Sequence, residues 1–173
     1  MDDIERRVRD TVTGIAGVEV IDCDPTLADT ADFCAAYGYA MDDSANAIVV
    51  IGKASSAAVP PVYAACLVLA SSRLDVNRVV RKRLGTKKAS FAPPEVTAEL
   101  TGMTMGGVTP FALPADLPLW IDRRVMARER IVVGGGSRAA KVVGPPSMLL
   151  TIPTAEVVDE LAVPAPSDQD PLR

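Results

Sequence analysis

The residues best suited to chemistry lie in one loop, "TGMTMGGVTPFALP". Gly106 and Gly107 lack a Cβ, so the backbone there can adopt unusual dihedral angles and approach a ligand closely. Pro110 fixes its own φ and keeps Thr109 extended. Together they could direct the N–H groups of Gly107, Val108 and Thr109 at one point and stabilise negative charge on an oxygen atom. Glycine and proline are also the ordinary residues of turns, and the loop alone favours that alternative.

The chain contains no histidine, which excludes several kinds of catalytic site. Ser–His and Cys–His nucleophile pairs need an imidazole, and most zinc sites use one. The three cysteines, Cys23, Cys34 and Cys66, lack metal-ligand spacing, and we expect them to be reduced and buried. We therefore expect no metal and no cofactor. A hydrolase with this sequence would depend on positioning, backbone donors or groups of its own substrate.

Charge is distributed unevenly along the chain, whose formal net charge is −4. Residues 1–43 include 11 acidic and 3 basic residues, residues 44–155 include 6 and 14, and residues 156–173 include 5 and 1. The basic middle is densest in "RVVRKRLGTKK". Such a segment can bind phosphate groups, or it can be a solvated helix whose cationic end complements the helix dipole. The sequence leaves both alternatives open.

Size and hydrophobicity indicate one globular domain. The chain has 173 residues and a mass of 18.2 kDa, and 49% of its residues are hydrophobic. Aromatic residues make up only 4%, so aliphatic side chains must fill the core. No apolar run is long enough to cross a bilayer, and the N-terminal residues do not resemble a signal peptide. With reduced cysteines, these features predict a cytoplasmic protein that does not enter a membrane.

The elements that must position the loop are helices and strands in irregular alternation. Helix periodicity and end signals predict helices near residues 2–13, 27–38, 74–85, 93–100 and 145–150. Apolar runs predict strands near residues 17–24, 45–52, 61–70 and 117–122, and a hairpin or adjacent strands at 128–135 and 138–144. Long βαβ units are too few for a doubly wound sheet, so we predict a mixed sheet flanked by helices. We place the domain at residues 1–160 and expect 161–173 to be a disordered tail.

Four motifs in order resemble the YbaK/ProX-like family of aminoacyl-tRNA editing domains. They are "RLD" after a strand, "KKASFA", the loop "TG…GGVTPF" and the later "GGGS". The resemblance covers roughly residues 28–158. It implies a compact α/β domain of the α+β type, with a mixed, largely antiparallel β-sheet or open barrel flanked by helices. It also implies a trans-acting hydrolase that deacylates mischarged tRNA, with small or prolyl-type amino acid errors as substrates.

The resemblance also assigns site residues. In this family the glycine-to-proline loop lines the pocket, which implies catalytic backbone donors at Gly106, Gly107 and Val108. Family members use such donors and the ribose hydroxyl of the tRNA rather than a side-chain base, as suits a chain without histidine. The implied substrate-binding residues are Asn46, Asp75, Thr109, Pro110, Gly135, Gly136 and Ser137. The implied tRNA-binding residues are Arg78, Arg81, Lys82, Lys87 and Lys88. Aminoacyl-tRNA is the expected partner, and an aminoacyl-tRNA synthetase is a further candidate.

One position departs from the family pattern. The editing enzymes typically carry a lysine at the start of the strand that here reads "ANAIVVIG", whereas this chain has Asn46. An asparagine donates hydrogen bonds but supplies no positive charge. Lys53 lies past the strand, and we expect it to face solvent. Two alternatives follow: an active deacylase, or a catalytically weakened module of the same fold that binds tRNA or the aminoacyl group.

Two implied site positions also have a structural interpretation. Asp75 is placed to cap the helix that follows it. The run Gly134–Ser137 could form a second wall of the pocket or simply the turn of a hairpin.

Overall fold

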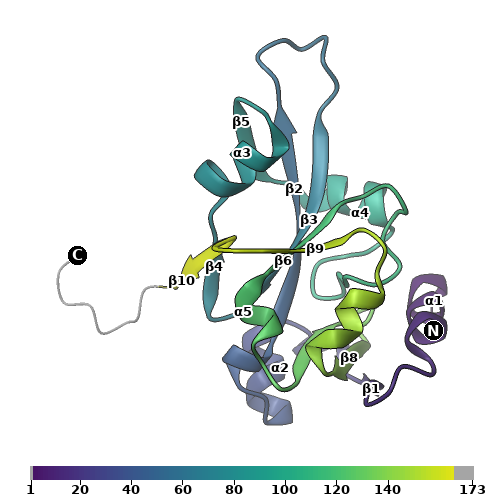
Figure 1. The fold of residues 1–173 in the computed structure, drawn as a ribbon. Coiled ribbons are helices and arrows are strands. Elements are labelled where there is room, and N and C mark those ends of the chain that lie inside the picture. Colours follow the sequence, from purple (N-terminus) through teal and green to yellow (C-terminus); the bar gives the residue numbers. More distant parts are fainter. Residues whose placement is uncertain (1, 166–173) are drawn as a thin grey trace.

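A five-stranded mixed sheet forms the centre of the fold (Figure 1). The structure is a computed structural model, and it describes residues 2–165. The strand order is β5–β2–β3–β6–β9, in which β2 pairs antiparallel with both neighbours and β6 pairs parallel with both. The strands are β2 (Ala45–Lys53), β3 (Val62–Leu69), β5 (Lys88–Phe91), β6 (Leu119–Asp122) and β9 (Ala155–Val158).

Helices cover both faces of this sheet, which explains the continuous apolar sequence of β3. Ala65 and Leu67 of β3 belong to the larger core cluster, together with Val8 of α1. The alternate residues, such as Cys66, face a second cluster that includes Val80. A strand buried on both faces needs apolar residues at every position rather than at alternate ones.

The helices and helical turns connect the strands. The helices are α1 (Asp3–Val12), α2 (Thr30–Tyr37), α3 (Arg81–Leu84), α4 (Pro94–Thr101) and α5 (Arg123–Met126). A π-helical turn, η3 (Val76–Val80), leads into α3, and 3₁₀ turns are η1 (Pro25–Leu27), η2 (Met41–Asp43) and η4 (Pro146–Thr151). Gly38 and Gly85 end α2 and α3 in the left-handed conformation, as the sequence predicts.

Two smaller sheets complete the domain. The first has the antiparallel order β1–β8–β7, formed by β1 (Glu19–Asp22), β7 (Ile131–Gly134) and β8 (Ala140–Gly144). The predicted hairpin of β7 and β8 is thereby confirmed. The second sheet pairs β4 (Ser72–Leu74) with β10 (Ala162–Pro164).

The predicted fold class is confirmed: the domain is α+β, with mixed, largely antiparallel sheets that do not close into a barrel. The predicted start of the tail at residue 161 is wrong, because Leu161 and Ala162 are fully buried in the second core cluster and β10 pairs with β4. The rest of that tail, residues 166–173, lies outside the described part of the chain. Within residues 2–165, no helix combines the length and apolar character required to span a bilayer.

Candidate functional site

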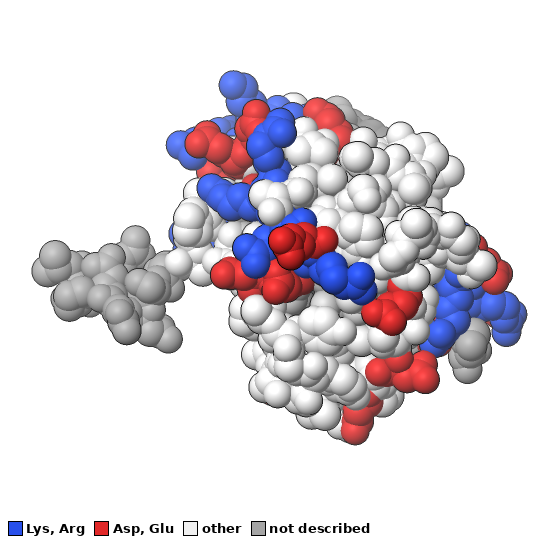
Figure 2. Space-filling model, turned by 60° about the horizontal axis from the view of Figure 1, so that its bottom comes forward, with Lys and Arg blue, Asp and Glu red and all other residues white. Residues whose placement is uncertain are grey.

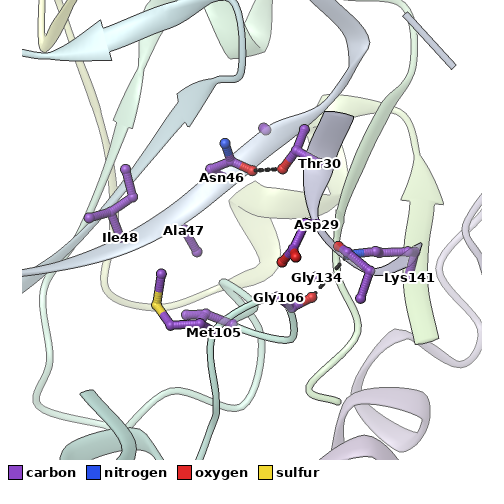
Figure 3. A pocket seen from close by; sticks show the side chains of 12 residues that line it. Asp29, Thr30, Asn46, Ala47, Ile48, Met105, Gly106, Gly134 and Lys141 are labelled. Atoms are coloured by element: carbon purple, nitrogen blue, oxygen red, sulfur yellow. Dashed lines mark hydrogen bonds between the residues drawn. The ribbon is translucent and has the colours of Figure 1, made fainter. Parts of the chain in front are cut away.

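A pocket of about 260 Å³ opens beside the first half of β2 (Figure 3). β5 pairs with β2 only from Val50 onward, so β5 leaves the edge at Ala45–Ile48 uncovered. The opposite wall is the predicted glycine loop, through Met105, Gly106 and Val108. The start of α2, with Asp29 and Thr30, and the β7–β8 hairpin, with Gly134 and Lys141, complete the lining. Segments distant in the sequence therefore meet at one cavity.

The glycine loop packs backbone to backbone against the β7–β8 turn. A Cβ on Gly107 would lie 2.6 Å from the carbonyl carbon of Ser137, and one on Gly134 would lie 2.0 Å from the carbonyl oxygen of Val108. The Gly136 N–H donates to the carbonyl of Gly107 at 2.9 Å. These separations leave no room for side chains, so glycines are required for the close approach. The turn therefore fixes the position of the loop.

The loop offers fewer free donors than its sequence predicts. The Gly107 N–H donates to the Thr104 carbonyl at 3.0 Å, and the Thr109 N–H lies 3.5 Å from the sulfur of Met103. Among the described residues, the Val108 N–H has no partner, and Val108 lines the pocket. The Gly106 N–H, the remaining implied donor, also has no partner among these residues, so the N–H groups of Gly106 and Val108 are the candidate donors to a ligand.

Asn46 lies in the pocket wall, at the position where the family pattern has a lysine. The Thr30 hydroxyl donates to its side-chain oxygen at 2.8 Å, as Figure 3 shows. The amide N–H groups of Asn46 have no partner within residues 2–165. They are available to a ligand, but they are uncharged.

Lys141 is a pocket residue that the sequence did not reveal. The residue belongs to β8 and is only 7% exposed. The ammonium donates to the carbonyls of Ala28 at 2.7 Å and Gly106 at 3.0 Å, and it lies 5.3 Å from the ring centre of Phe33. Burial lowers the pKa of this lysine. The available signal was a single lysine within the apolar run "RAAKVVG", which is unusual in a buried strand.

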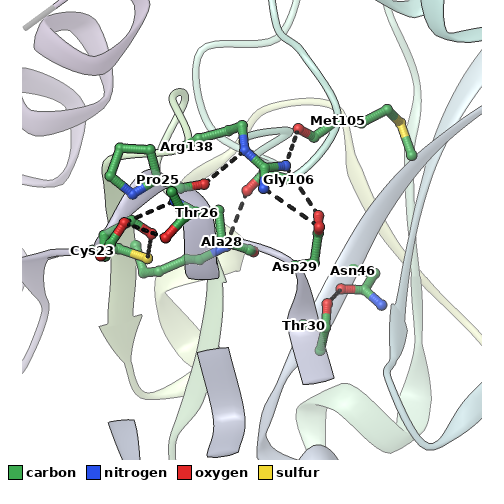
Figure 4. A network of polar contacts seen from close by, with 12 residues as sticks. Cys23, Pro25, Thr26, Ala28, Asp29, Thr30, Asn46, Met105, Gly106 and Arg138 are labelled. Atoms are coloured by element: carbon green, nitrogen blue, oxygen red, sulfur yellow. Dashed lines mark hydrogen bonds and ion pairs between the residues drawn. The ribbon is translucent and has the colours of Figure 1, made fainter. Parts of the chain in front are cut away.

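Arg138 connects three segments around the pocket (Figure 4). It donates to the carboxylate of Asp29 at 3.0 Å, to the Met105 carbonyl at 3.1 Å and to the Pro25 carbonyl at 2.9 Å. The guanidinium holds the pKa of Asp29 below its usual value, through a hydrogen bond and its charge. Arg138 therefore links the β7–β8 turn to both the glycine loop and the start of α2.

Comparison of the chain with known protein families identifies the family to which it belongs. The model of the aminoacyl-tRNA editing domain matches residues 24–152, which is most of the chain. The chain belongs to the aminoacyl-tRNA editing domain family.

Solved structures agree with this editing domain in fold. A protein proposed to be a trans-editing enzyme for prolyl-tRNA synthetase is 24% identical, with a TM-score of 0.75, over 92% of this chain and 97% of that one. A hypothetical protein is 23% identical with the same TM-score of 0.75, over 94% of this chain and all of the other. Similarity at this level of identity establishes the fold alone.

Several predicted site residues of the editing domain lie outside the pocket. Asp75 caps η3 by accepting from the Arg78 N–H at 3.2 Å, so the structure places it in its capping position. Pro110 lines a separate hollow, and Thr109 is fully buried. Ser137 donates to Glu5 at 2.7 Å. Gly135 and Gly136, in the same turn as Ser137, do not line the pocket either, although the Gly136 N–H holds the glycine loop through the carbonyl of Gly107.

The basic segment divides into two groups. Arg81, Lys87 and Lys88 line a second hollow of about 550 Å³, which also contains Lys53. We call this hollow the basic groove. Lys82 does not line it, and Arg78 instead pairs with Asp75 at 3.1 Å.

The basic groove brings positively charged side chains close together. Lys53 and Lys88 are directly opposite each other in the β2–β5 ladder, an arrangement that is unfavourable unless an anion lies between them. Lys53 is exposed as predicted, but it shares a groove with three other basic residues. By contrast, acidic and basic side chains lie close together around a broad uncharged area on the face in Figure 2.

Proposed function

We propose that this editing domain is a trans-acting deacylase that hydrolyses the ester between tRNA and a wrongly attached amino acid. Family membership supports a tRNA editing role. The observation that supports the chemistry is the pocket itself, where the family's glycine loop carries the free Val108 N–H opposite Asn46. The pocket lining contains no serine or cysteine, and the Thr30 hydroxyl donates to Asn46 with no imidazole to activate it, so water is the expected nucleophile.

In the proposed reaction, water attacks the carbonyl carbon of the ester. The carbonyl oxygen becomes negative, and the Val108 N–H stabilises that charge in a fixed geometry. The tetrahedral intermediate then collapses and the bond to the ribose oxygen breaks. One proton of the attacking water passes to the ribose oxygen, the other passes to solvent, and the amino acid leaves as a carboxylate. A cavity of about 260 Å³, partly lined by alanines and glycines, suits small or prolyl-type amino acids.

The basic groove is the proposed binding site for tRNA phosphates. It lies toward the far end of β2, and Lys53 is five residues beyond Ile48 of the pocket. At the rise of a strand this is about 17 Å. A tRNA whose terminal ester enters the pocket would then pass its acceptor stem along β2 to the groove. By analogy with its structural relative, we propose an association with prolyl-tRNA synthetase.

A panel of mischarged tRNAs tests the proposal. The purified protein is incubated with each aminoacyl-tRNA, and the loss of the ester is followed against the spontaneous rate. We expect faster hydrolysis for one or a few small amino acids. The proposal is wrong if no member of the panel is hydrolysed above background.

The second candidate function is a binding module of the same fold with weakened catalysis, favoured by the uncharged Asn46 in the pocket wall. It predicts that the protein retards tRNA in a salt-dependent manner but hydrolyses none of the panel. The panel combined with a tRNA-binding measurement distinguishes the two functions.

A further inference from the structure

Lys141 has an unusual environment for a buried lysine. A buried ammonium is normally paired with a carboxylate, because removing a charge from water is costly. Here no carboxylate of residues 2–165 lies within 4.0 Å of its nitrogen. Its two hydrogen-bond partners are neutral carbonyls, those of Ala28 and Gly106. The pocket wall therefore contains a positive charge that the protein does not neutralise by direct contact.

The ammonium also has an unused donor. A lysine ammonium has three N–H groups, and two of them donate to the carbonyls of Ala28 and Gly106. The third has no partner among the described residues, and Lys141 lines the cavity. A charged donor that is largely buried interacts more strongly with a ligand than it would at the surface.

A purely structural role does not explain the charge. Arg138 already ties the glycine loop to the start of α2 through Met105 and Asp29. A neutral donor could hold the carbonyl of Gly106 without the desolvation penalty of an ion. The charge is favourable once an electronegative group of a ligand enters the pocket.

We propose that Lys141 is the cationic group of the editing pocket, which donates its third N–H to the carbonyl oxygen of the scissile ester. This inference rests on the proposed function. The ammonium stabilises the negative charge that develops on this oxygen as water attacks. It supplies from β8 the positive charge that Asn46 does not supply from β2.

The first test removes the positive charge of Lys141 and then places a positive charge on the β2 wall of the pocket. Lys141→Met keeps most of the apolar length, and we expect kcat to fall about 100-fold or more, with a smaller change in KM, because a transition-state donor is lost. Adding Asn46→Lys to Lys141→Met returns a cation from β2, and we expect it to recover part of the lost rate. Arg7→Met removes one exposed charge from α1, outside the pocket and the groove, and serves as the matched control.

The second test uses pH. Burial lowers the pKa of Lys141 and Arg138 lowers it further, whereas Cys23, Asp29 and Cys34 act in the opposite direction. Lys141 is charged below this lowered pKa and loses its proton as the pH rises through it. The rate, corrected for spontaneous hydrolysis, should therefore decline on the alkaline side. Lys141→Arg keeps the cation at every accessible pH, so we expect its profile to lack that decline.

These outcomes separate the inference from the proposed function. If the wild-type protein hydrolyses no mischarged tRNA, the proposed function is refuted, and the inference that rests on it falls with it. If it is active and folded Lys141→Met keeps the wild-type kcat, the role of Lys141 is refuted. If Lys141→Met does not fold, the pH profile decides, and an alkaline decline in Lys141→Arg identical to that of the wild type refutes the inference.

Discussion

Gly106 and Gly14 share a left-handed φ angle in different surroundings, which makes them a matched pair for testing the loop. Their φ angles are +85° and +86°. A Cβ on Gly14 would meet nothing within 4 Å, whereas one on Gly106 would lie 2.3 Å from the Arg138 guanidinium. Alanine at either position thus incurs the strain of a left-handed φ, but only at Gly106 does it also displace Arg138.

The expected difference in stability follows from these contacts. A left-handed alanine costs roughly 1–2 kcal/mol, so we expect Gly14→Ala to lose about that much free energy of unfolding. Gly106→Ala should lose about 1 kcal/mol more, because the displaced Arg138 gives up its bonds to Asp29 and Met105, and a half-exposed ion pair contributes only about 0–1 kcal/mol. The difference corresponds to a Tm shift of roughly 2–4 °C in a domain of this size.

Activity should separate the pair more clearly than stability. A misplacement of about 1 Å at a reacting centre can reduce the rate on the order of 100-fold, and Gly106 lies in the wall that presents Val108 to the pocket. Denaturant unfolding gives the free energies, and deacylation of the tRNA that the wild type hydrolyses best gives kcat. We expect Gly14→Ala to keep its kcat and Gly106→Ala to lose most of it. Equal stabilities and equal kcat values for the two variants would refute the role given to the loop.

Three further predictions concern other parts of the molecule. Lys88→Gln should weaken tRNA binding and reduce its salt dependence, whereas Lys82→Gln, outside the basic groove, should change neither. Equal effects of the two substitutions would contradict the proposed binding of tRNA phosphates in the basic groove. Asp122 is 1% exposed and accepts from the Ala162 N–H at 2.8 Å, so Asp122→Ala should lower the free energy of unfolding by about 2–4 kcal/mol in denaturant titrations. Burial raises the pKa of Cys66 to about 12, so its thiol should resist alkylation at pH 8 until the protein unfolds; rapid labelling of the native protein would count against this burial.

The longer elements could be predicted from the sequence because local patterns determine them. The apolar runs of β2 and β3 match the structure closely, and Gly38 and Gly85 mark helix ends correctly. The short strands β4, β5, β9 and β10 were missed, because none contains an apolar run long enough to predict a strand and each forms only through partners elsewhere in the chain. The tail was misjudged for the same reason, since β10 depends on β4.

The candidate site was predictable only in part. The glycine loop and Asn46 do meet in one pocket, as the family resemblance implies. Which N–H groups remain free depends on folding, because the carbonyl of Thr104 and the sulfur of Met103 engage two of them. Lys141 was missed because the direction of a side chain on β8 depends on strand register, and a shift of one residue would turn it to the other face.

The lysines of β5 also affect how copies of the protein behave toward one another. β5 is an outermost strand of the central sheet, so its outer side has no neighbouring strand in the described part of the chain. Exposed sheet edges can pair between molecules and start aggregation, and lysine on such a strand opposes this. We therefore expect Lys87 and Lys88, just before and at the first residue of β5, to oppose such pairing in addition to their proposed contact with tRNA. Variants that neutralise both should be checked by light scattering, because self-association would lower the apparent affinity for tRNA without any loss of a phosphate contact.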